Sequence, residues 1–295
     1  MSHFSVLVIG DDVEAALAPF QENNMGDCPK AYLAFNDIED EHRQEYETES
    51  VEMVRLPNGE LVLPWDERFR VPGTIGTGGG THKAPPELAR VQVPFKEKYE
   101  SFEVFMFDGC GHQKRDPEKH RYGSWENQHR KWDWWEVGGR FSKTLKLKPG
   151  GTGVFMECGE GFGAPRMLRE TTEGFVDQAR LKCIDWEGMR QRRLAEHAQW
   201  YSEFERKKLE GEDVRFLRYS YDIKEGQTRE EYIRGAERFS VFAVAKDGKW
   251  FERGKMGWWA CVSNEKDPVK WAKELEAMLS DLPPDSLLTI VDCHI

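Results

Sequence analysis

Runs of apolar residues mark the predicted strands and helices along the chain. Residues 3–10, HFSVLVIG, form a β-branched apolar run of the kind that makes a buried strand. Asp11 or Asp12 is then placed to cap a helix, because apolar residues follow at helical spacing. Two further apolar runs flank Asn58-Gly59, a pair that favours the tight turn of a β-hairpin. The start of the chain therefore predicts a strand, a helix and a hairpin.

Helical patterns recur further along the chain. Residues 36–50 are acidic and polar, which predicts a solvated helix or a loop. Asp185 is placed to cap a long, highly charged helix over 186–210, and Asp267-Pro268 combines a capping residue with a proline suited to the first helical turn. One more helical face is predicted from four residues three or four positions apart: Phe95, Tyr99, Phe102 and Met106.

The C-terminal part alternates strands with turns. RFSVFAVAKDGKWFERG predicts two strands joined at Asp247-Gly248, and MGWWACVSN predicts another strand, with GWW in the core. SLLTIVDCHI predicts a final edge strand that ends in polar residues. This mixture indicates an α+β fold. We expect one mainly antiparallel sheet with helices on one side and a ferredoxin-like arrangement at both ends.

Shifts in composition divide the chain into four predicted parts. Residues 1–70 hold the strand, helix and hairpin, and 71–94 are a Gly/Pro-rich loop. Residues 95–217 form a helical, Trp-rich and basic insert, and 218–295 form an α+β part that shares a sheet with the first. The loop contains GTIGTGGGTHK, but no Gly-Lys-Ser/Thr follows at the required spacing. We therefore expect a flexible lid or linker there, rather than a phosphate-binding loop.

Charge narrows the classes of function. The net charge of −11 argues against general nucleic-acid binding, which needs a basic surface. The charge is unevenly distributed: residues 11–67 contain 16 acidic and 3 basic residues, whereas 110–148 contain 10 basic and 5 acidic ones. A locally basic segment in an acidic protein would concentrate an anion in one place.

Cysteines and hydropathy indicate a compartment. The six cysteines are scattered without a CxxC pair, in a chain long enough to fold without disulfides. The N-terminus lacks the basic region of a signal peptide, and no apolar stretch is long enough to span a membrane. We expect reduced thiols in the cytoplasm and no membrane partner.

The segment KWDWWEVGGRF, residues 131–141, is chemically the most unusual. In one interpretation its tryptophans belong to the core, and strand alternation places Trp132 and Trp134 on one face, with Asp133 and Trp135 on the other. In a second interpretation the indoles stack on a base, while glycine N–H groups and basic side chains bind its phosphate. A third is a partner-protein interface. The candidate ligand-binding residues are Trp132, Trp134, Trp135, Arg140, Lys131 and Arg130.

Histidines upstream of this segment supply candidate catalytic groups. His112 and Asp108 have the residue types of a general base and the carboxylate that orients it, and His120 lies further along. Cys110 and His112 are zinc-binding types, but no second close pair with ligand spacing follows. The sequence therefore predicts no metal site.

The C-terminal VDCHI holds another Asp–His pair. Neighbours on a strand point to opposite faces, so Asp292 and His294 share a face, whereas Cys293 and His294 cannot easily share a metal. Asp292 and His294 have the chemistry of an acid–base unit. The simpler interpretation is the polar end of an edge strand.

Six stretches carry a resemblance that extends over the whole chain. They occur in the order MSHFSVLVIG, LAPFQEN, KWDWWEVGGRF, CIDWEGM, GKWFERGKMGWW and LLTIVDCHI. Together they resemble a family of uncharacterised bacteriophage and prophage proteins. The resemblance implies a phage gene product that acts in the infected bacterial cytoplasm, and accessory phage proteins of this kind often counter host defence.

Three functions stay open. The leading hypothesis is a phage accessory protein that counters host antiviral defence by binding a small anionic ligand such as a nucleotide. The second is a nucleotide or phosphoester hydrolase that uses His112, His120 and Asp108. The third is a direct protein inhibitor of a host defence factor, in which acidic residues 11–67 imitate nucleic acid. The sequence identifies no cofactor and leaves the oligomeric state open.

Overall fold

The computed structural model describes residues 2–71, 81–112, 114–158, 166–257 and 261–295. The chain forms two compact units: unit 1 holds Met1–Leu33 and Asn127–Ile295, and unit 2 is the intervening Ala34–Glu126. Both ends of unit 2 meet, because strand β2 (Ala34–Asp37) pairs with β8 (Gly123–Glu126). These boundaries differ from the predicted divisions after residues 70, 94 and 217.

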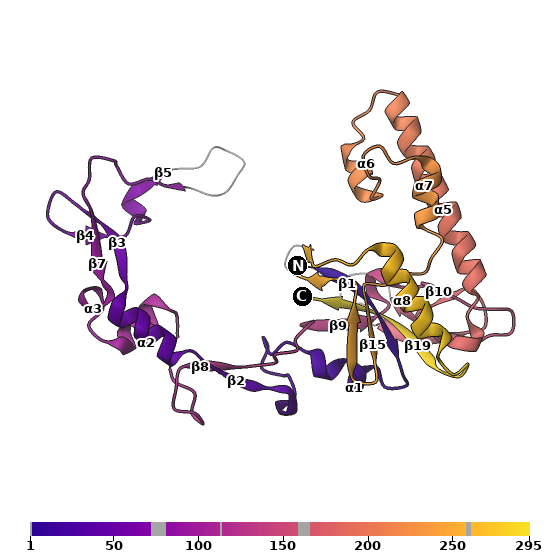
Figure 1. Ribbon diagram of the computed structural model, residues 1–295, viewed down its shortest axis with the longest axis horizontal. Helices are drawn as coiled ribbons and strands as arrows, with labels where there is room; N and C mark the ends of the chain where they lie inside the picture. Colours follow the sequence, from indigo (N-terminus) through magenta and orange to yellow (C-terminus); the bar gives the residue numbers. More distant parts are fainter. Residues whose placement is uncertain (1, 72–80, 113, 159–165, 258–260) are drawn as a thin grey trace. The chain divides into compact units, whose positions relative to one another are not determined.

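Unit 1 is built on a sheet of eight described strands (Figure 1). In order they are β12 (Arg166–Thr171), β11 (Gly153–Cys158), β14 (Gln178–Arg180), β19 (Leu287–His294), β1 (His3–Ile9), β15 (Ala243–Lys246) and β16 (Lys249–Glu252), with β9 (Trp134–Val137) as a further partner of β19. Only β1 and β15 pair in parallel within this sheet as described. The predicted α+β class with a mainly antiparallel sheet is confirmed.

Strand β19 lies at the centre of this sheet. It pairs with β1 along one edge, and with β14 and β9 along the other. The prediction of an edge strand is therefore wrong. The apolar run LLTIV is continuous because both faces of the strand are buried.

The strand order also differs from the expected ferredoxin-like arrangement. That arrangement uses a split βαβ unit, in which another strand separates the two parallel ones. Here β1 and β15 are parallel and lie side by side.

Hydrophobic clusters cover both faces of the sheet. One contains Leu7 and Ile290 and packs against α8 (Pro268–Ser280) and the start of α5 (Trp186–Leu209). The other contains Val6 and Val8 and packs against the short α1 (Val13–Leu17). The two long helices that contact the sheet therefore share one face.

The predicted helix starts are confirmed by their caps. The carboxylates of Asp12, Asp185 and Asp267 accept backbone N–H bonds, each of 2.9 Å, three residues ahead. The far part of α5 packs with α6 (Arg215–Ser220) and α7 (Arg229–Gly235) around a small aromatic cluster. The predicted hairpin turn at Asp247-Gly248 is confirmed between β15 and β16. Two small ladders complete unit 1: β10 (Leu145–Lys146) with β13 (Phe175–Val176), and β17 (Lys255–Met256) with β18 (Val262–Ser263).

Unit 2 is smaller and is held by short pairings. The hairpin predicted at Asn58-Gly59 is confirmed, and the acidic stretch forms a helix. The predicted helical face at 95–106 is divided, because the Ser101 hydroxyl accepts the Val104 N–H and starts a new helix. Besides β2 and β8, unit 2 contains α2 (Glu39–Thr48), β3 (Ser50–Arg55), β4 (Leu61–Val62), β5 (Arg70–Val71), β6 (Thr81–His82), β7 (Arg90–Pro94), α3 (Phe95–Lys98), α4 (Phe102–Val104) and the π-helical turn Phe105–Gly109.

Some predicted features fall outside the described residues. They are residues 72–80 of the Gly-rich loop, together with Trp258 and Trp259 of GWW. Within the described ranges, no helix combines the length and apolar character needed to cross a bilayer.

Candidate functional site

A cleft of about 1120 Å³ lies over the face of the unit 1 sheet that carries α1. Phe4, Phe20 and Phe242 of the cluster on that face line it. Among the described residues that line this cleft, Glu252 is the only acidic one. The basic lining residues are Arg130, Lys131, Lys249 and Lys255, together with His129. We call this site the basic cleft.

The buried Asn127 positions one wall of the basic cleft. Its side-chain amide donates to the carbonyls of Pro19 and Gln21, both at 2.9 Å. The Lys131 N–H donates to the Phe20 carbonyl at 2.7 Å. These hydrogen bonds hold residues 127–132 beside the segment that follows α1. The backbone that carries Arg130 and Lys131 is therefore held in place on both sides of the two residues.

The β15–β16 hairpin also lines the basic cleft. Asp247 and Gly248 both have positive φ values, +51° and +68°, as the tight hairpin turn requires. Beyond the turn, the Trp250 indole N–H donates to one carboxylate oxygen of Glu252 at 2.8 Å, and Lys131 Nζ lies 2.7 Å from the other. Glu252 thus orients an indole and neutralises one lysine.

Two other lysines of the basic cleft carry uncompensated charge. Lys249 and Lys255 are exposed, and neither side chain forms a hydrogen bond or ion pair with another described residue. Arg130 lies 3.6 Å from Glu22 and is partly neutralised. The lining is therefore positive, and it includes the aromatic rings of Tyr32 and Trp250. Such a site is suited to an anion that carries a flat ring.

The structure separates the six predicted ligand-binding residues. Arg130 and Lys131 line the basic cleft, whereas Trp135 packs against the hydrophobic cluster on the same face. Trp132 is only 4% exposed, and its indole N–H donates to the Leu17 carbonyl at 3.1 Å, so it packs in the core. The remaining two, Trp134 and Arg140, are exposed elsewhere on unit 1.

The predicted alternation within KWDWWEVGGRF is wrong. Trp132 lies in the cluster on one face, whereas Trp134 pairs across to His294 on the other. The reason is that β9 begins only at Trp134, while Trp132 forms an isolated bridge with Gln21. Period-two alternation does not hold across this junction.

Gly138 and Gly139 pack against buried carboxylates. Both have positive φ, and a Cβ atom would lie 2.7 Å from Asp177 at Gly138 and 2.5 Å from Asp292 at Gly139. The backbone N–H of the next residue, Arg140, donates to the Asp292 carboxylate at 2.9 Å. The glycines therefore permit close packing on these carboxylates, and they supply no phosphate cradle in this arrangement.

Two Asp–His pairs lie beside this turn. His3 Nδ1 is 3.0 Å from an Asp292 oxygen, and His294 Nδ1 is 2.6 Å from an Asp133 oxygen. The two imidazole rings meet edge to face at 5.0 Å, and Trp134 stacks on His294. The sequence placed Asp292 and His294 on one face, but each pairs with a residue that is distant in sequence.

His294 has one ring nitrogen without a partner. Because a carboxylate can only accept, Nδ1 carries the hydrogen that is shared with Asp133. Nε2 is buried and has no hydrogen-bond partner among the described atoms. Cys293 points into the cluster on the opposite face, where burial raises its thiol pKa well above the usual value. The expectation that Cys293 and His294 would not share a metal agrees with this placement.

The predicted catalytic residues belong to unit 2. His112 lies beside His42, with ring centroids 6.0 Å apart, whereas Asp108 and His120 are exposed. In the described part of unit 2, neither histidine has a hydrogen bond to Asp108. Across all described residues, no group of three metal-ligating side chains could hold a metal ion.

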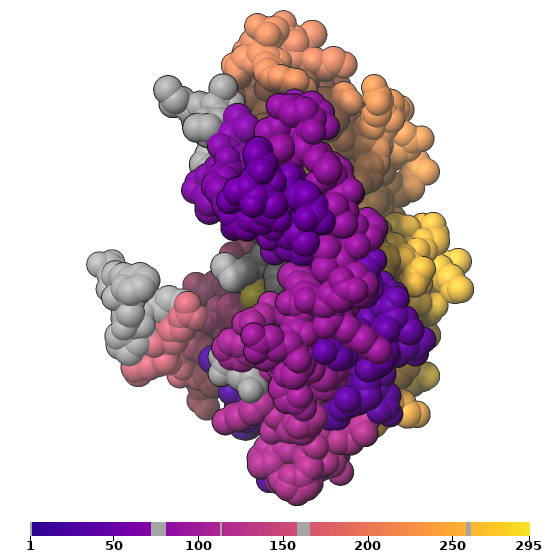
Figure 2. Space-filling view, turned by 90° about the vertical axis from the view of Figure 1, so that its left-hand side faces the viewer, coloured from indigo at the N-terminus to yellow at the C-terminus, as the bar shows by residue number. Residues whose placement is uncertain are grey.

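The acidic run and the basic segment pair with one another inside unit 2. Figure 2 shows the indigo and violet part of unit 2 against its magenta part. Glu39 binds Arg115 and Arg43, and Asp37 binds Arg121. Arg115, Arg43 and a backbone N–H together lower the pKa of the buried Glu39 to about 2. Much of the acidic run is therefore neutralised locally, which reduces its resemblance to a nucleic-acid surface.

Comparison with known proteins found no matching family model, curated protein or solved structure. Functional interpretation therefore depends on the sites themselves. The signal missed in the sequence was GKWFERGK, in which lysines and aromatic residues follow a tight turn.

Proposed function

We propose that the protein binds a small anionic ligand with an aromatic group, such as a nucleotide, in the basic cleft. The observation that carries the proposal is that uncompensated lysines and an oriented indole share one cleft. Lys249 and Lys255 supply charge, and Trp250 supplies a ring held by Glu252.

The charge, the aromatic rings and the volume of the basic cleft suit this class of ligand. Lysine and arginine form charge-assisted hydrogen bonds with phosphate oxygens. Stacking of a base on an aromatic side chain contributes about 1–3 kcal/mol. A volume of about 1120 Å³ can accommodate a nucleotide together with bound water.

The resemblance to phage proteins supports a biological role. We propose that ligand capture in the bacterial cytoplasm counters a host antiviral defence that depends on a nucleotide. Removal of the ligand from solution would suffice for this role, without a contact to a host protein.

Isothermal titration with ATP, cyclic AMP and cyclic di-AMP tests the binding proposal. The double variant Lys249→Glu/Lys255→Glu should weaken binding at least about 100-fold, because two charge-assisted contacts become repulsive. The matched control is Lys270→Glu/Lys273→Glu, which makes the same charge change on the exposed side of α8.

Wild-type affinity in the cleft variant would reject the assignment. An equal loss in the α8 control would also reject it, because only the overall charge would then matter.

A further inference from the structure

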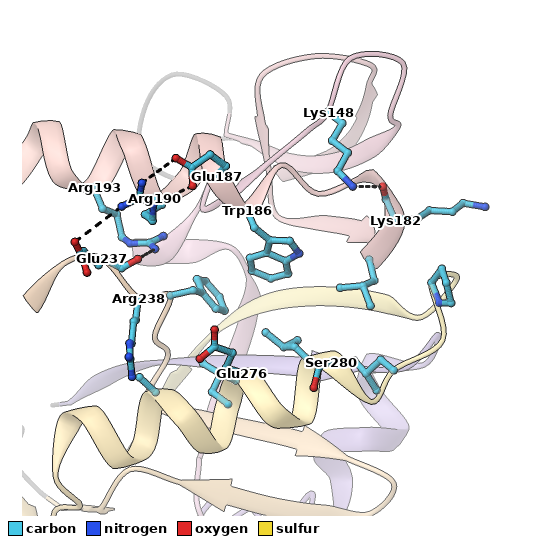
Figure 3. A pocket seen from close by; sticks show the side chains of 17 residues that line it. Lys148, Lys182, Trp186, Glu187, Arg190, Arg193, Glu237, Arg238, Glu276 and Ser280 are labelled. Carbon is cyan, nitrogen blue, oxygen red and sulfur yellow. Dashed lines mark hydrogen bonds and ion pairs between the residues drawn. The ribbon is translucent and has the colours of Figure 1, made fainter. Parts of the chain in front are cut away.

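A second cleft in unit 1, of about 720 Å³, lies over the opposite face of the sheet. Helix α8, the start of α5 and the segment after α7 line it. Figure 3 shows Trp186 at its centre, with Glu276 and Ser280 entering from α8. We call this site the amphipathic cleft.

The base of the amphipathic cleft is continuous with the hydrophobic core. Leu275 is 1% exposed and belongs to the cluster on this face, and Leu279 packs against that cluster. Trp186 and Phe239 meet edge to face with centroids 5.2 Å apart. An apolar group seated here would extend the core and leave water, which is favourable at about 25 cal/mol per Å².

Several charged groups at the rim already have partners of opposite charge. Arg190 forms two bonds with Glu187, at 2.9 and 3.0 Å. Lys182 pairs with Asp285 at 2.5 Å. A ligand would have to displace these contacts in order to use the groups.

Three cations keep uncompensated charge. Arg193 donates to the carbonyls of Ala236 and Glu237, at 3.1 and 3.2 Å, and burial lowers its pKa. Among the described residues, the Lys148 ammonium donates only to the Lys182 carbonyl, at 3.1 Å. Arg238 forms no hydrogen bond or ion pair with any residue that the structure describes, and Figure 3 shows it beside the cleft.

Two lining carboxylate charges oppose these cations: that of Glu276, and one of the charges of Glu187 and Glu237, which both pair with Arg190. The side chain of Glu276 has no ion pair or hydrogen bond within the described part of the chain. The uncompensated charge around the cleft is therefore positive. An anion would gain more from the three cations than it loses to these two carboxylate charges.

We infer that the amphipathic cleft binds a small organic anion with an apolar aromatic body, such as an aryl carboxylate or sulfonate. The ring would rest on Trp186 and Leu279, and the acid group would bind Arg238. This site is separate from the basic cleft, and its volume is typical of drug-sized ligands.

Titration with 8-anilinonaphthalene-1-sulfonate, a fluorescent aryl sulfonate, tests the inference. Arg238→Gln should weaken binding about tenfold, because a charge-assisted contact is lost. Glu276→Gln should tighten binding about threefold, because a repelling charge is removed. Arg234→Gln, at an exposed arginine outside the cleft, is the matched control and should change nothing.

A pair of competitors separates anion recognition from apolar binding. Indole-3-acetate should displace the dye, and the neutral indole-3-acetamide should do so about tenfold more weakly. Lys249→Glu/Lys255→Glu should leave dye binding unchanged. Thermal melts followed by circular dichroism show whether each variant is folded.

Two results would overturn the inference. One is the absence of saturable dye binding to the folded wild type. The other is equal dye affinity in Arg238→Gln and Glu276→Gln, since the two substitutions change charge in opposite directions.

Discussion

The two clefts of unit 1 differ in how their charges are used. In the basic cleft, Lys249 and Lys255 face solvent and have no carboxylate partner among the described residues, and the aromatic ring of Trp250 is held by Glu252. In the amphipathic cleft, Arg190 and Lys182 are bound to neighbouring acids, Arg238 has no carboxylate partner among the described residues, and the base is apolar. The number of basic residues alone would not distinguish them. We expect the ligand preference of each cleft to depend on two properties. One is which basic side chains are not already paired with a carboxylate. The other is whether the aromatic ring beside them is held by a polar partner or by the hydrophobic core.

Substitution of the aromatic residue in each cleft should give the largest difference in ligand affinity between the two clefts. Trp250→Ala should weaken ATP binding about 10- to 100-fold through lost stacking, and Trp186→Ala should do the same for the dye. Each substitution should leave the other ligand unaffected in titrations. Trp→Phe at either site should restore most of the loss. If either Ala variant weakened both ligands, the two clefts would not be independent.

Glu39 tests whether unit 2 contributes to either cleft. Glu39→Gln should destabilise unit 2 by about 2 kcal/mol near neutral pH, because the buried carboxylate loses its ion pairs with Arg115 and Arg43. Chemical denaturation measures this loss, and both ligand affinities should stay at wild-type values.

The pH dependence of this loss has a definite sign. The folded pKa of Glu39 is lowered to about 2, so its stabilisation is present above the unfolded pKa of about 4.5. It should disappear progressively as the pH falls from 4.5 towards 2. A Glu39→Gln penalty that was constant over this range would contradict the account.

Salt concentration should affect the two ligand affinities differently, but by less than the tryptophan substitutions do. Raising the salt concentration from 50 to 500 mM should weaken ATP binding about tenfold, because the lysines of the basic cleft are solvent-exposed. Dye binding should change only about twofold, since apolar burial dominates there. Equal salt dependence for both ligands would remove the distinction drawn here.

Glu252→Gln should give the smallest effect. The amide oxygen can still accept from the Trp250 indole, while Lys131 is freed from its ion pair. ATP binding should tighten about threefold, as removal of Glu276 should do for the dye in the other cleft. Weaker ATP binding would instead show that the glutamate positions Lys131 for the ligand.

Local signals accounted for much of the fold. The strand at residues 3–10, the turn at Asp247-Gly248 and the start of α8 at Asp267-Pro268 depend on neighbouring residues, and all three were predictable. The central place of β19 was not, because it depends on pairing with β1 at the other end of the chain.

The basic cleft was only partly predictable for the same reason. Arg130 and Lys131 were candidates from the local density of charge and tryptophan. Trp250 joins them only because a distant hairpin packs over the segment that Asn127 holds in place. Similarly, no periodicity could show that His294 pairs with Asp133.

The most direct test of the central claim is photocrosslinking with 8-azido-ATP, followed by peptide mass spectrometry. The account predicts labelling of residues 128–131 or 249–256, and loss of that labelling when unmodified ATP competes. Labelling confined to α8, to the start of α5 or to unit 2 would contradict the assignment of the nucleotide to the basic cleft. Labelling that excess ATP did not reduce would contradict it as well.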